Sequence, residues 1–375
     1  MMPLGMKLRG LLAGLVIAGI WAANPASANP AILFDLANGK VVMHQDAFKR
    51  WYPASLTKLM TAYVAFRAVA AGELALDSPI EITKHAAAEP PSKMGFKPGS
   101  IVTLDNALKM MLIKSANDIA MAVGENVGGS QEAFAQRMNA ESQRLGMTGS
   151  HWVNPNGLFD PDQYTTARDL ALLVAAIRRE FPQYAPYFAI QGLKAGKRTL
   201  MSYNLLVGRY DGADGMKTGF VCSSGFNMIG SATRNGRSFT AIVLGAHSGL
   251  KRVEKVAGML DRGFASTGGQ TVTLGTLAAY GEPGAPATDM RPEICEGKKG
   301  AAQSEDVGDD PKAAPSRWRA KIPNPQLVKV GTGGATGPVP LMWRDRVEYA
   351  DVPIPQPRPD YPPVKQAAQG DTVAN

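Results

Sequence analysis

The sequence YPASLTKLM, residues 52–60, places a serine three residues before a lysine. The chain from 56 to 74 is rich in Ala, Leu, Met and Phe and has no Gly or Pro before Gly72, so we expect a helix that begins at or just after the proline. Positions three apart share one face of a helix, and Ser55 and Lys58 should therefore point the same way. A neutral lysine amine can take the proton of a serine hydroxyl and make it a nucleophile. Backbone N–H groups at the helix start favour an oxyanion.

A serine and a lysine at this spacing are common by chance and usually lie on a solvated helix face, so the motif needs support from elsewhere. The triplet SAN, residues 115–117, lies at a break between two predicted helices, where short polar side chains reach neighbouring backbone. The triplet KTG, residues 217–219, lies in a short stretch bounded by glycines and typical of a strand. These three motifs, in this order, are the signature of serine enzymes that react with penicillin.

With these motifs, residues 29–264 resemble the low-molecular-mass penicillin-binding proteins that are D-alanyl-D-alanine carboxypeptidases. Further segments fit the resemblance, namely NPNGL (154–158), TARDLA (166–171), DGMKTGF (214–220) and GF (263–264). The resemblance covers nearly the whole of one predicted domain. It implies an α/β (α+β) fold of the β-lactamase/transpeptidase type, in which an antiparallel sheet is flanked by helices and a helical subdomain is inserted.

The resemblance also implies catalytic roles. Ser55 is the expected nucleophile, which forms an acyl-enzyme with the penultimate D-alanine carbonyl, and Lys58 is the expected base. Lys58 must be neutral to act, and both burial and a second cation nearby, Lys217, favour its neutral form. Ser115 is expected to relay a proton to the leaving D-alanine nitrogen. Asn117 is expected to hold Lys58 or the substrate amide.

The substrate-binding residues follow from the same resemblance. Lys217 and Thr218, together with the motif glycine Gly219, are expected to receive the terminal carboxylate, although an exposed strand lysine is the structural alternative for Lys217. The oxyanion hole would be formed by the backbone N–H groups of Ser55 and Phe220. The expected partners are thus the stem peptide of peptidoglycan and β-lactam antibiotics, which act as covalent inhibitors.

Arg252 and the histidines are weaker candidates. Arg252 follows the last predicted strand, and its guanidinium could help to hold a carboxylate or could be an ordinary solvated arginine on a helix. The four histidines are His44, His85, His151 and His247. They have no metal-ligand spacing, so we expect no metal and no cofactor.

Three other functions compete with a carboxypeptidase. A β-lactamase would share the nucleophile, but one large class deacylates with a glutamate on a loop before the lysine-threonine-glycine strand, and residues 150–169 contain no glutamate. A non-catalytic β-lactam or peptidoglycan-binding protein would not need all of the reactive residues. A bifunctional wall polymerase would need a transmembrane anchor and a glycosyltransferase domain, for which we find neither a segment nor room.

Composition and the N-terminus indicate an exported globular protein. The chain has 375 residues, 45% hydrophobic and 19% charged, with a net charge of +8. It lacks a basic cluster with interleaved aromatics, so nucleic acid is a poor candidate partner. Lys7 and Arg9 precede an apolar run at 11–23, and PASA at 25–28 offers a cleavage site. This pattern predicts a signal peptide over 1–28 and no transmembrane anchor.

The mature chain shows strand signals at both ends and helical signals between them. Asn-Gly pairs at 38–39 and 235–236 separate apolar runs and predict two hairpins. The intervening region, 75–203, is mostly helical, and residues 250–264 form a closing helix. We therefore expect a catalytic domain over 29–266 whose sheet is made from both ends of the domain, with a helical lobe inserted.

Residues 267–375 are predicted to form a Pro/Gly-rich C-terminal extension, with a strand-like patch at 326–330. Proline-rich runs suit docking onto aromatic grooves, but a solvated spacer is favoured. The extension shows no hydrophobic stripe of an amphipathic membrane helix, so we expect a soluble periplasmic protein, or one held by partners or peptidoglycan. Cys222 and Cys295 are predicted to form a disulfide that pins the start of the extension at the cleft rim, with two unpaired thiols as the alternative.

Overall fold

The computed structural model describes residues 29–296 and 316–344, so the predicted signal peptide lies outside the described residues. The main sheet has five antiparallel strands in the order β2-β1-β9-β8-β7. These strands are β1 (Ala31–Asp35), β2 (Val41–Gln45), β7 (Ala213–Val221), β8 (Gly225–Arg234) and β9 (Arg237–Ala246). Strands from the two ends of the domain pair directly, because β1 lies beside β9 with Ile32 opposite Ile242. The predicted sheet topology is confirmed.

Both predicted hairpins are present. The turn between β8 and β9 consists of Asn235 and Gly236, with φ angles of 49° and 75°. Positive φ at both central residues is the geometry that an Asn-Gly pair accepts most readily and that matches the twist of the flanking strands. The turn between β1 and β2 likewise places Gly39 at φ 70°.

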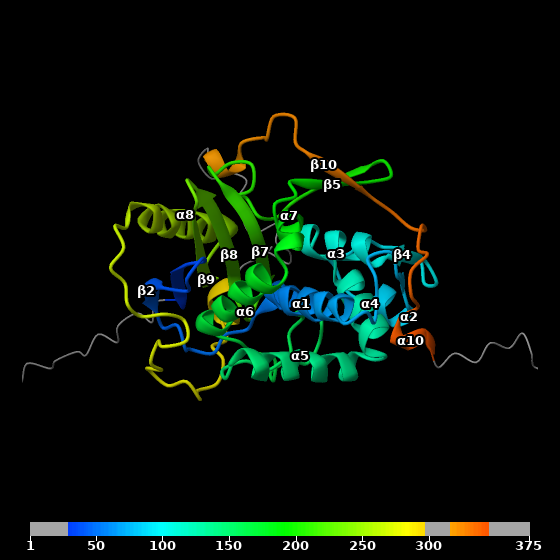
Figure 1. Cartoon of the computed structure of the whole chain (residues 1–375), viewed down its shortest axis with the longest axis horizontal. Helices are drawn as coiled ribbons and strands as arrows, with labels where there is room; N and C mark the ends of the chain where they lie inside the picture. The colour runs from blue at the N-terminus through cyan, green and yellow to red at the C-terminus, as the bar shows by residue number, and fades with distance from the viewer. Residues whose placement is uncertain (1–28, 297–315, 345–375) are drawn as a thin grey trace, which may run out of the picture.

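Helices cover both faces of the sheet and also form a separate lobe beside it (Figure 1). The helices of eight or more residues are α1 (Thr57–Ala70), α3 (Leu104–Ile113), α4 (Asn117–Gly128), α5 (Gln131–Leu145), α6 (Ala167–Glu180) and α8 (Gly249–Ala265). Helix α8 packs on β8 and β9, whereas α6 packs on β1 and β9. Because β8 is buried at eight consecutive positions, 225–232, the sheet must be covered on both sides.

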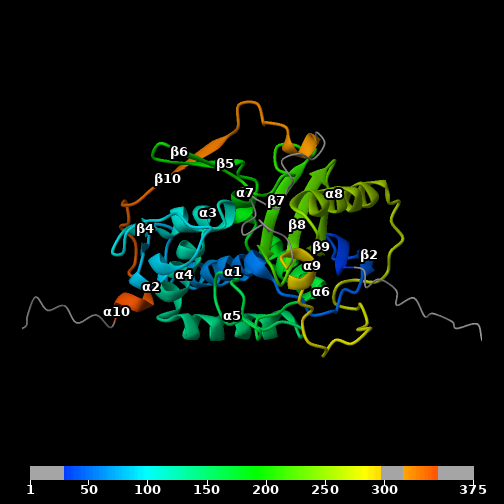
Figure 2. The same ribbon diagram turned by 180° about the vertical axis from the view of Figure 1, so that it is seen from behind.

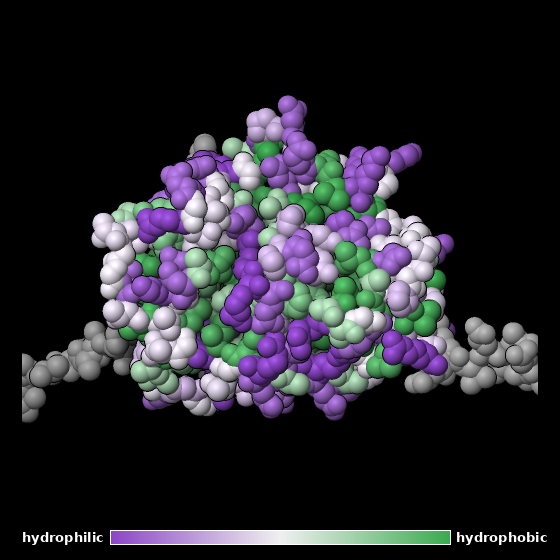
Figure 3. Space-filling view, in the orientation of Figure 1, coloured by the Kyte–Doolittle hydropathy of each residue, from purple (hydrophilic) through white to green (hydrophobic). Residues whose placement is uncertain are grey.

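The helical lobe surrounds α1, which is buried along most of its length. Helices α3, α4 and α5 pack around it, and their starts are fixed by side-chain caps where the sequence offers Ser or Thr. Thr103 accepts a hydrogen bond from the backbone N–H of Asn106, and Ser130 accepts one from Ala133. Helix α5 turns a hydrophilic surface to solvent at the lower edge of the view in Figure 3.

Helix α6 begins with a side-chain cap from Thr166, whereas the acidic residue of its first turn bonds elsewhere. Thr166 accepts a hydrogen bond from the N–H of Asp169, as a cap should. The carboxylate of Asp169 instead accepts hydrogen bonds from the N–H of Gly149 and the hydroxyl of Ser150, at 2.8 Å each. Burial raises the pKa of Asp169, and these two hydrogen bonds oppose that rise. Asp169 therefore ties the loop after α5 to α6.

The shorter elements are β3 (Pro79–Glu81), α2 (Lys84–Ala88), β4 (Ile101–Thr103), α7 (Ala185–Phe188), β5 (Gly192–Ala195), β6 (Arg198–Met201), α9 (Arg291–Ile294), β10 (Leu327–Val330) and α10 (Leu341–Arg344), with 3-10 turns η1 (Ala54–Leu56), η2 (Pro182–Tyr184) and η3 (Arg317–Arg319). Strands β3 and β4 form a small antiparallel pair. Strands β10, β5 and β6 form a three-stranded sheet in that order.

The C-terminal extension folds back on the catalytic domain. The predicted disulfide between Cys222 and Cys295 is present and holds α9 beside the end of β7 (Figure 2). Residues 316–344, which we call the strap, run across the top of the molecule from η3 to α10 (Figure 1). Within the strap, β10 pairs in parallel with β5, and Trp318 is buried against Tyr210. The solvated-spacer interpretation is therefore wrong for these residues.

Candidate active site

The turn η1 and the first turn of α1 bring Ser55 and Lys58 together as the sequence predicted. The Nζ atom of Lys58 donates a hydrogen bond of 2.8 Å to the Oγ atom of Ser55. It also donates to Oδ1 of Asn117 at 2.8 Å and to the carbonyl oxygen of Asn156 at 2.6 Å. The lysine side chain has no exposed surface. Three donated hydrogen bonds require the ammonium form of Lys58. When Lys58 is neutral, its lone pair can instead accept the hydrogen bond from the Ser55 hydroxyl, which is the arrangement that activates a serine.

The backbone around Ser55, the expected nucleophile, adopts a conformation that residues with a Cβ atom rarely take. Ala54, directly before Ser55, has a φ of 48°. Such a conformation is costly for a residue with a Cβ atom and persists where the surroundings hold it. Gly157, at φ 87°, is in close contact with this turn: a Cβ atom on Gly157 would overlap the carbonyl oxygen of Ala54. The loop that carries Asn156 thus also fixes the position of Ser55.

A second serine–lysine pair comes from two other elements. Ser115 lies between α3 and α4 with a φ of 60°, and the Nζ atom of Lys217 on β7 donates to its Oγ atom at 2.8 Å. Lys217 also donates to the carbonyl oxygen of Thr218 at 2.8 Å and is only 2% exposed. The alternative of an exposed strand lysine is therefore wrong. The three sequence motifs converge on one place, with Asn117 joining the second motif to Lys58.

Strand β7 packs directly against η1, the turn that carries Ser55. A Cβ atom on Gly219 would lie 2.9 Å from the backbone nitrogen of Ser55, so only glycine allows this approach. Asn227 on the neighbouring strand secures the turn, because its Nδ2 atom donates to the carbonyl oxygens of Tyr52 and Pro53 at 2.9 and 3.1 Å. The edge of the sheet and the start of α1 are thereby held as one unit.

A cavity of about 340 Å³ opens over Ser55. Its walls include residues from all the segments described above. The lining residues are Ser55, Pro90, Pro91, Ser92, Ser115, Asn117, Asn156, Gly157, Leu158, Tyr203, Phe220, Val221 and Cys222. The disulfide to α9 is thus part of the cavity wall, as the sequence-based hypothesis requires.

Arg252 is buried and does not belong to the described lining of this cavity. It is 3% exposed, so the interpretation as a solvated helix arginine is wrong. Its Nη1 atom lies 3.3 Å from the carbonyl oxygens of Gly219 and Asn227, and its guanidinium lies over the ring of Phe226. It also lines a neighbouring cavity beyond Tyr203. These contacts make it a support for β7 at the KTG motif.

Sequence reasoning did not assign roles to several residues of the site. The carbonyl oxygen of Asn156 accepts from Lys58, but a backbone acceptor leaves no side-chain signal beyond the turn-forming NPNG pattern. Tyr203 lines the cavity and accepts a hydrogen bond from Lys114, the residue before the SAN motif. Residues 90–92 form one wall, and the Pro-Pro pair is the only sequence signal that marks them.

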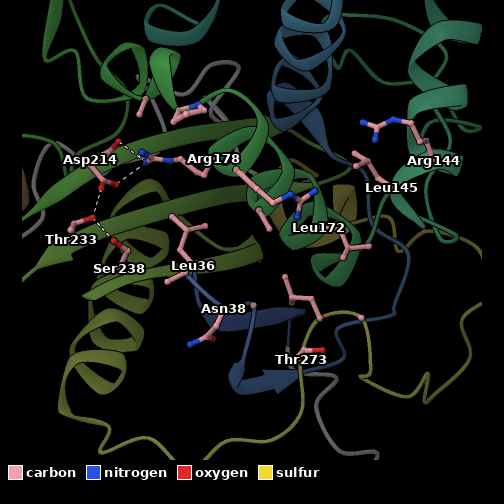
Figure 4. A pocket seen from close by; sticks show the side chains of 18 residues that line it. Leu36, Asn38, Arg144, Leu145, Leu172, Arg178, Asp214, Thr233, Ser238 and Thr273 are labelled. Atoms are coloured by element: carbon pink, nitrogen blue, oxygen red, sulfur yellow. Dashed lines mark hydrogen bonds and ion pairs between the residues drawn. The ribbon is translucent and has the colours of Figure 1, made fainter. Parts of the chain in front are cut away.

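A larger cavity, about 810 Å³, lies elsewhere, between α6, the turn of the first hairpin and the start of β7 (Figure 4). Two of its charged residues, Arg178 and Asp214, form an ion pair with each other. Asp214 accepts from Arg178 at 2.8 Å and from the Thr233 hydroxyl at 2.7 Å, and Thr233 contacts Ser238 at 2.8 Å. None of the three sequence motifs contributes to its described lining, and its size alone does not make it an active site.

Two groups of findings place this geometry in a known class. The fold is that of the serine enzymes with a β-lactamase/transpeptidase-like domain, and residues 20–248 match the family of D-alanyl-D-alanine carboxypeptidases, peptidase S11. The chain belongs to this family. It is 34% identical to the D-alanyl-D-alanine carboxypeptidase DacC of Escherichia coli K12 over 281 residues, which cover 68% of this chain and 69% of DacC. It is 30% identical to DacF of Bacillus subtilis over 243 residues, covering 63% of this chain and 62% of DacF.

Solved structures agree with this assignment. The carboxypeptidase DacD of Francisella tularensis shares 30% identity, with a TM-score of 0.62 over 64% of this chain and 70% of that one. Penicillin-binding protein D2 of Listeria monocytogenes, in its cefotaxime-bound form, shares 31% identity, with a TM-score of 0.58 over 64% of this chain and 97% of that one. The family match, residues 20–248, ends before the strap begins.

Two further features of the described residues bear on the site. No group of three or more His, Cys, Asp or Glu side chains in residues 29–296 and 316–344 is placed to hold a metal ion. Within the same two ranges, every helix is too short or too polar to cross a bilayer.

Proposed function

We propose that the chain removes the terminal D-alanine from peptidoglycan stem peptides that end in D-Ala-D-Ala, through an acyl-enzyme on Ser55. The observation that carries this proposal is the buried contact of 2.8 Å between Lys58 Nζ and Ser55 Oγ, in a cavity that Ser115 and Asn117 also line. Family membership supports this reaction, and the contacts support the proposed roles of the residues.

Acylation begins when neutral Lys58 takes the Ser55 proton and the serine oxygen attacks the penultimate D-alanine carbonyl. The backbone N–H groups of Ser55 and Phe220 then stabilise the oxyanion. Removing one such donor typically costs about 3 kcal/mol of transition-state stabilisation. The proton on Lys58 reaches the leaving nitrogen through Ser115, and the carbon–nitrogen bond breaks. In deacylation, water attacks the ester, Lys58 takes the water proton, and Ser55 leaves with a proton.

The leaving residue carries the terminal carboxylate of the peptide. Lys217 and Thr218 receive it, because the buried ammonium group of Lys217 lies at Ser115, where the leaving nitrogen must be. Asn117 holds Lys58 in place through its side-chain oxygen. Arg252 acts indirectly. It donates a hydrogen bond to the Gly219 carbonyl and so holds the KTG segment in contact with the turn that carries Ser55.

β-Lactams are the expected covalent inhibitors, because their strained amide presents a carbonyl and a carboxylate in the same relation as D-Ala-D-Ala. The two Listeria monocytogenes structures named as cefotaxime-bound and ampicillin-bound forms support this expectation by similarity. The β-lactamase alternative is weaker, since residues 150–169 supply no glutamate for deacylation.

We place the enzyme in the periplasm. The signal-peptide pattern at residues 1–28 and the disulfide between Cys222 and Cys295 both support export to an oxidising compartment. Fractionation tests this placement: mature protein found mainly in the cytoplasm, with residues 1–28 retained, would contradict it.

The direct test is release of D-alanine from a pentapeptide that ends in D-Ala-D-Ala. Wild-type protein should release it, Ser55→Ala should not, and Ser115→Ala should be slowed by about 10²-fold or more because proton transfer to the leaving group is lost. Thr233→Ala, which lines the larger cavity, is the control and should act like the wild type. Release by Ser55→Ala at the wild-type rate would refute the proposal.

A further inference from the structure

The proposed reaction gives the cavity a direction. In that reaction the terminal carboxylate binds at Lys217, and the carbonyl under attack lies at the N–H of Phe220. Both residues belong to β7, which is an edge strand of the main sheet. The rest of the peptide must therefore continue toward the end of β7, where Val221 and Cys222 line the cavity. The residue before D-Ala-D-Ala leaves the cavity at this end.

A segment of the C-terminal extension is fixed beside this end of the cavity. The disulfide already described anchors the end of α9 to it. The N–H of Met290, whose side chain is buried, donates to the carbonyl oxygen of Ser223 at 3.0 Å. Thr288 forms a parallel bridge with Trp51. Residues 288–295, which we call the rim segment, are thus held in place from both ends.

The rim segment carries Arg291 at the mouth of the cavity. Its guanidinium lies 4.0 Å over the centre of the Phe159 ring. Phe159 directly follows Leu158, a residue of the cavity lining, and its ring centre is 5.1 Å from that of Tyr52. The side chain of Arg291 is 38% exposed, and its described ion pair, of 2.9 Å to Asp289, uses Nη1 alone. A guanidinium has five N–H donors, so an arginine held flat on a ring in this way can bind a carboxylate at its exposed edge.

Carboxylates surround this guanidinium. Burial raises the pKa of the Tyr52 hydroxyl most, Asp289 raises it further, and Arg291 lowers it. Asp160 and Asp162 add smaller effects of the same sign as that of Asp289. The three carboxylates would repel an anionic substituent at the mouth, and Arg291 opposes them. The charge on Arg291 therefore decides whether such a substituent is accepted.

We propose that Arg291 is a specificity-determining residue that binds a carboxylate on the side chain of the residue before D-Ala-D-Ala. This inference rests on the proposed function and names the class of stem peptide that the same site takes. The carboxylate accepts hydrogen bonds from the exposed edge of the guanidinium. A side chain that ends in an amide binds more weakly, and one that ends in an ammonium group meets a like charge.

The alternative is a purely structural role, in which Arg291 only fastens the rim segment to Phe159. The two roles differ in their dependence on the substrate. Loss of a structural contact would slow every peptide by the same factor, whereas loss of a carboxylate-binding group must slow the acidic peptide more than the others.

The test is kcat/KM for release of D-alanine from three N-acetylated peptides that end in D-Ala-D-Ala. The residue before this pair is 2-aminopimelate, its side-chain amide, or lysine. These side chains share the same methylene chain and end in a carboxylate, an amide and an ammonium group. Wild type should prefer the carboxylate to the amide by about tenfold, as for one charge-assisted contact at a partly exposed position. The lysine peptide should be slower than the amide.

Two neighbouring substitutions should change this preference in opposite directions. Arg291→Gln should lower the carboxylate-to-amide ratio to about one or less, because the carboxylates around it remain, and Arg291→Lys should restore part of it. Asp289→Asn should raise the ratio, because it releases Nη1 and removes a repelling charge. Arg317→Gln is the matched control, since Arg317 is also an exposed arginine over a ring, that of Trp318 on the strap. Its ratio should equal that of wild type.

Three outcomes overturn the inference: a wild-type ratio near one, an Arg291→Gln variant that slows all three peptides equally, or an Asp289→Asn variant with a lowered ratio. In each of these D-alanine is still released, so the proposed function stands. Failure of wild type to release D-alanine from any of the three peptides would refute the proposed function, and the inference with it.

Discussion

The Nζ atom of Lys217 lies 2.8 Å from the Oγ atom of Ser115, although 102 residues separate them in the chain. The corresponding pair of Lys58 and Ser55 is three residues apart and lies at the same distance. One serine–lysine pair is therefore built into a helix start, and the other exists only when β7 meets the break between α3 and α4. The proposed reaction uses both pairs, so the sheet and the helical lobe must be correctly packed before it can occur.

The role of Lys58 as a base predicts that charge alone does not suffice at this position. Lys58→Arg keeps a cation but cannot deprotonate, because a guanidinium remains charged at all working pH values. We expect acylation by penicillin to slow by about 10³-fold. Lys109→Arg, at an ion pair with Asp105 on α3, is the control and should retain the wild-type rate. A rate for Lys58→Arg within tenfold of wild type would show that another group is the base.

Substitution of Gly157 should reduce stability and acylation more than substitution of a glycine with positive φ that faces open space. In Gly157→Ala the new methyl group would overlap the Ala54 carbonyl and displace the turn that carries Ser55. We therefore expect loss of acylation, and a decrease of about 1–3 kcal/mol in the free energy of unfolding. Gly196 also has a positive φ, 56°, but faces open space. Gly196→Ala should cost about 1 kcal/mol and leave acylation intact. Urea unfolding and acylation rates measure both effects, and equal losses in the two variants would contradict the account.

Glu89 should make stability depend on pH. Burial raises its pKa above the ordinary 4.5, so the protonated form is favoured in the folded state. The stability that this form contributes is complete below pH 4.5 and is lost as the pH rises through the folded-state pKa. Glutamine does not titrate. The unfolding free energy of Glu89→Gln should therefore increase relative to wild type between pH 4 and pH 7, as measured by urea unfolding. A difference that shrinks over this range would mean that Glu89 prefers the ionised form.

The strap should contribute to the stability of the catalytic domain. Trp318 is 4% exposed and stacks on Tyr210, so Trp318→Ala should cost about 3 kcal/mol of unfolding free energy. Leu327 lies on the same strap but is 36% exposed, and Leu327→Ala should cost less than about 1 kcal/mol. Thermal unfolding compares the two variants. If Trp318→Ala unfolds at the wild-type temperature, the strap does not stabilise the domain.

Much of the fold could be predicted from short sequence patterns. The Asn-Gly pairs predicted both hairpins, because the glycine of each pair takes a positive φ, and in the second hairpin Asn235 takes one as well. The spacing of Ser55 and Lys58 predicted their contact, because a helix turn fixes the relation between positions three apart. The order of strand and helix signals was enough to predict a sheet closed by both ends of the domain.

The remainder depends on contacts between distant segments. Strand β10 pairs with β5 across more than a hundred residues, and nothing within either strand indicates the partner. The three-stranded sheet was missed because residues 192–201 lie in a region that looked mostly helical. Asn156 contributes a backbone carbonyl group, so its contact with Lys58 became visible only when α1 and the 154–158 loop were placed together.

The central claim is that Ser55 is the nucleophile of a penicillin-sensitive carboxypeptidase. Intact-mass measurement of the mature protein after incubation with benzylpenicillin tests it most directly. We predict one added penicilloyl group on the wild type, located on the peptide that contains Ser55, and no added mass on Ser55→Ala. An adduct that survives in Ser55→Ala, or a wild type that consumes the drug without retaining an adduct, would contradict the account.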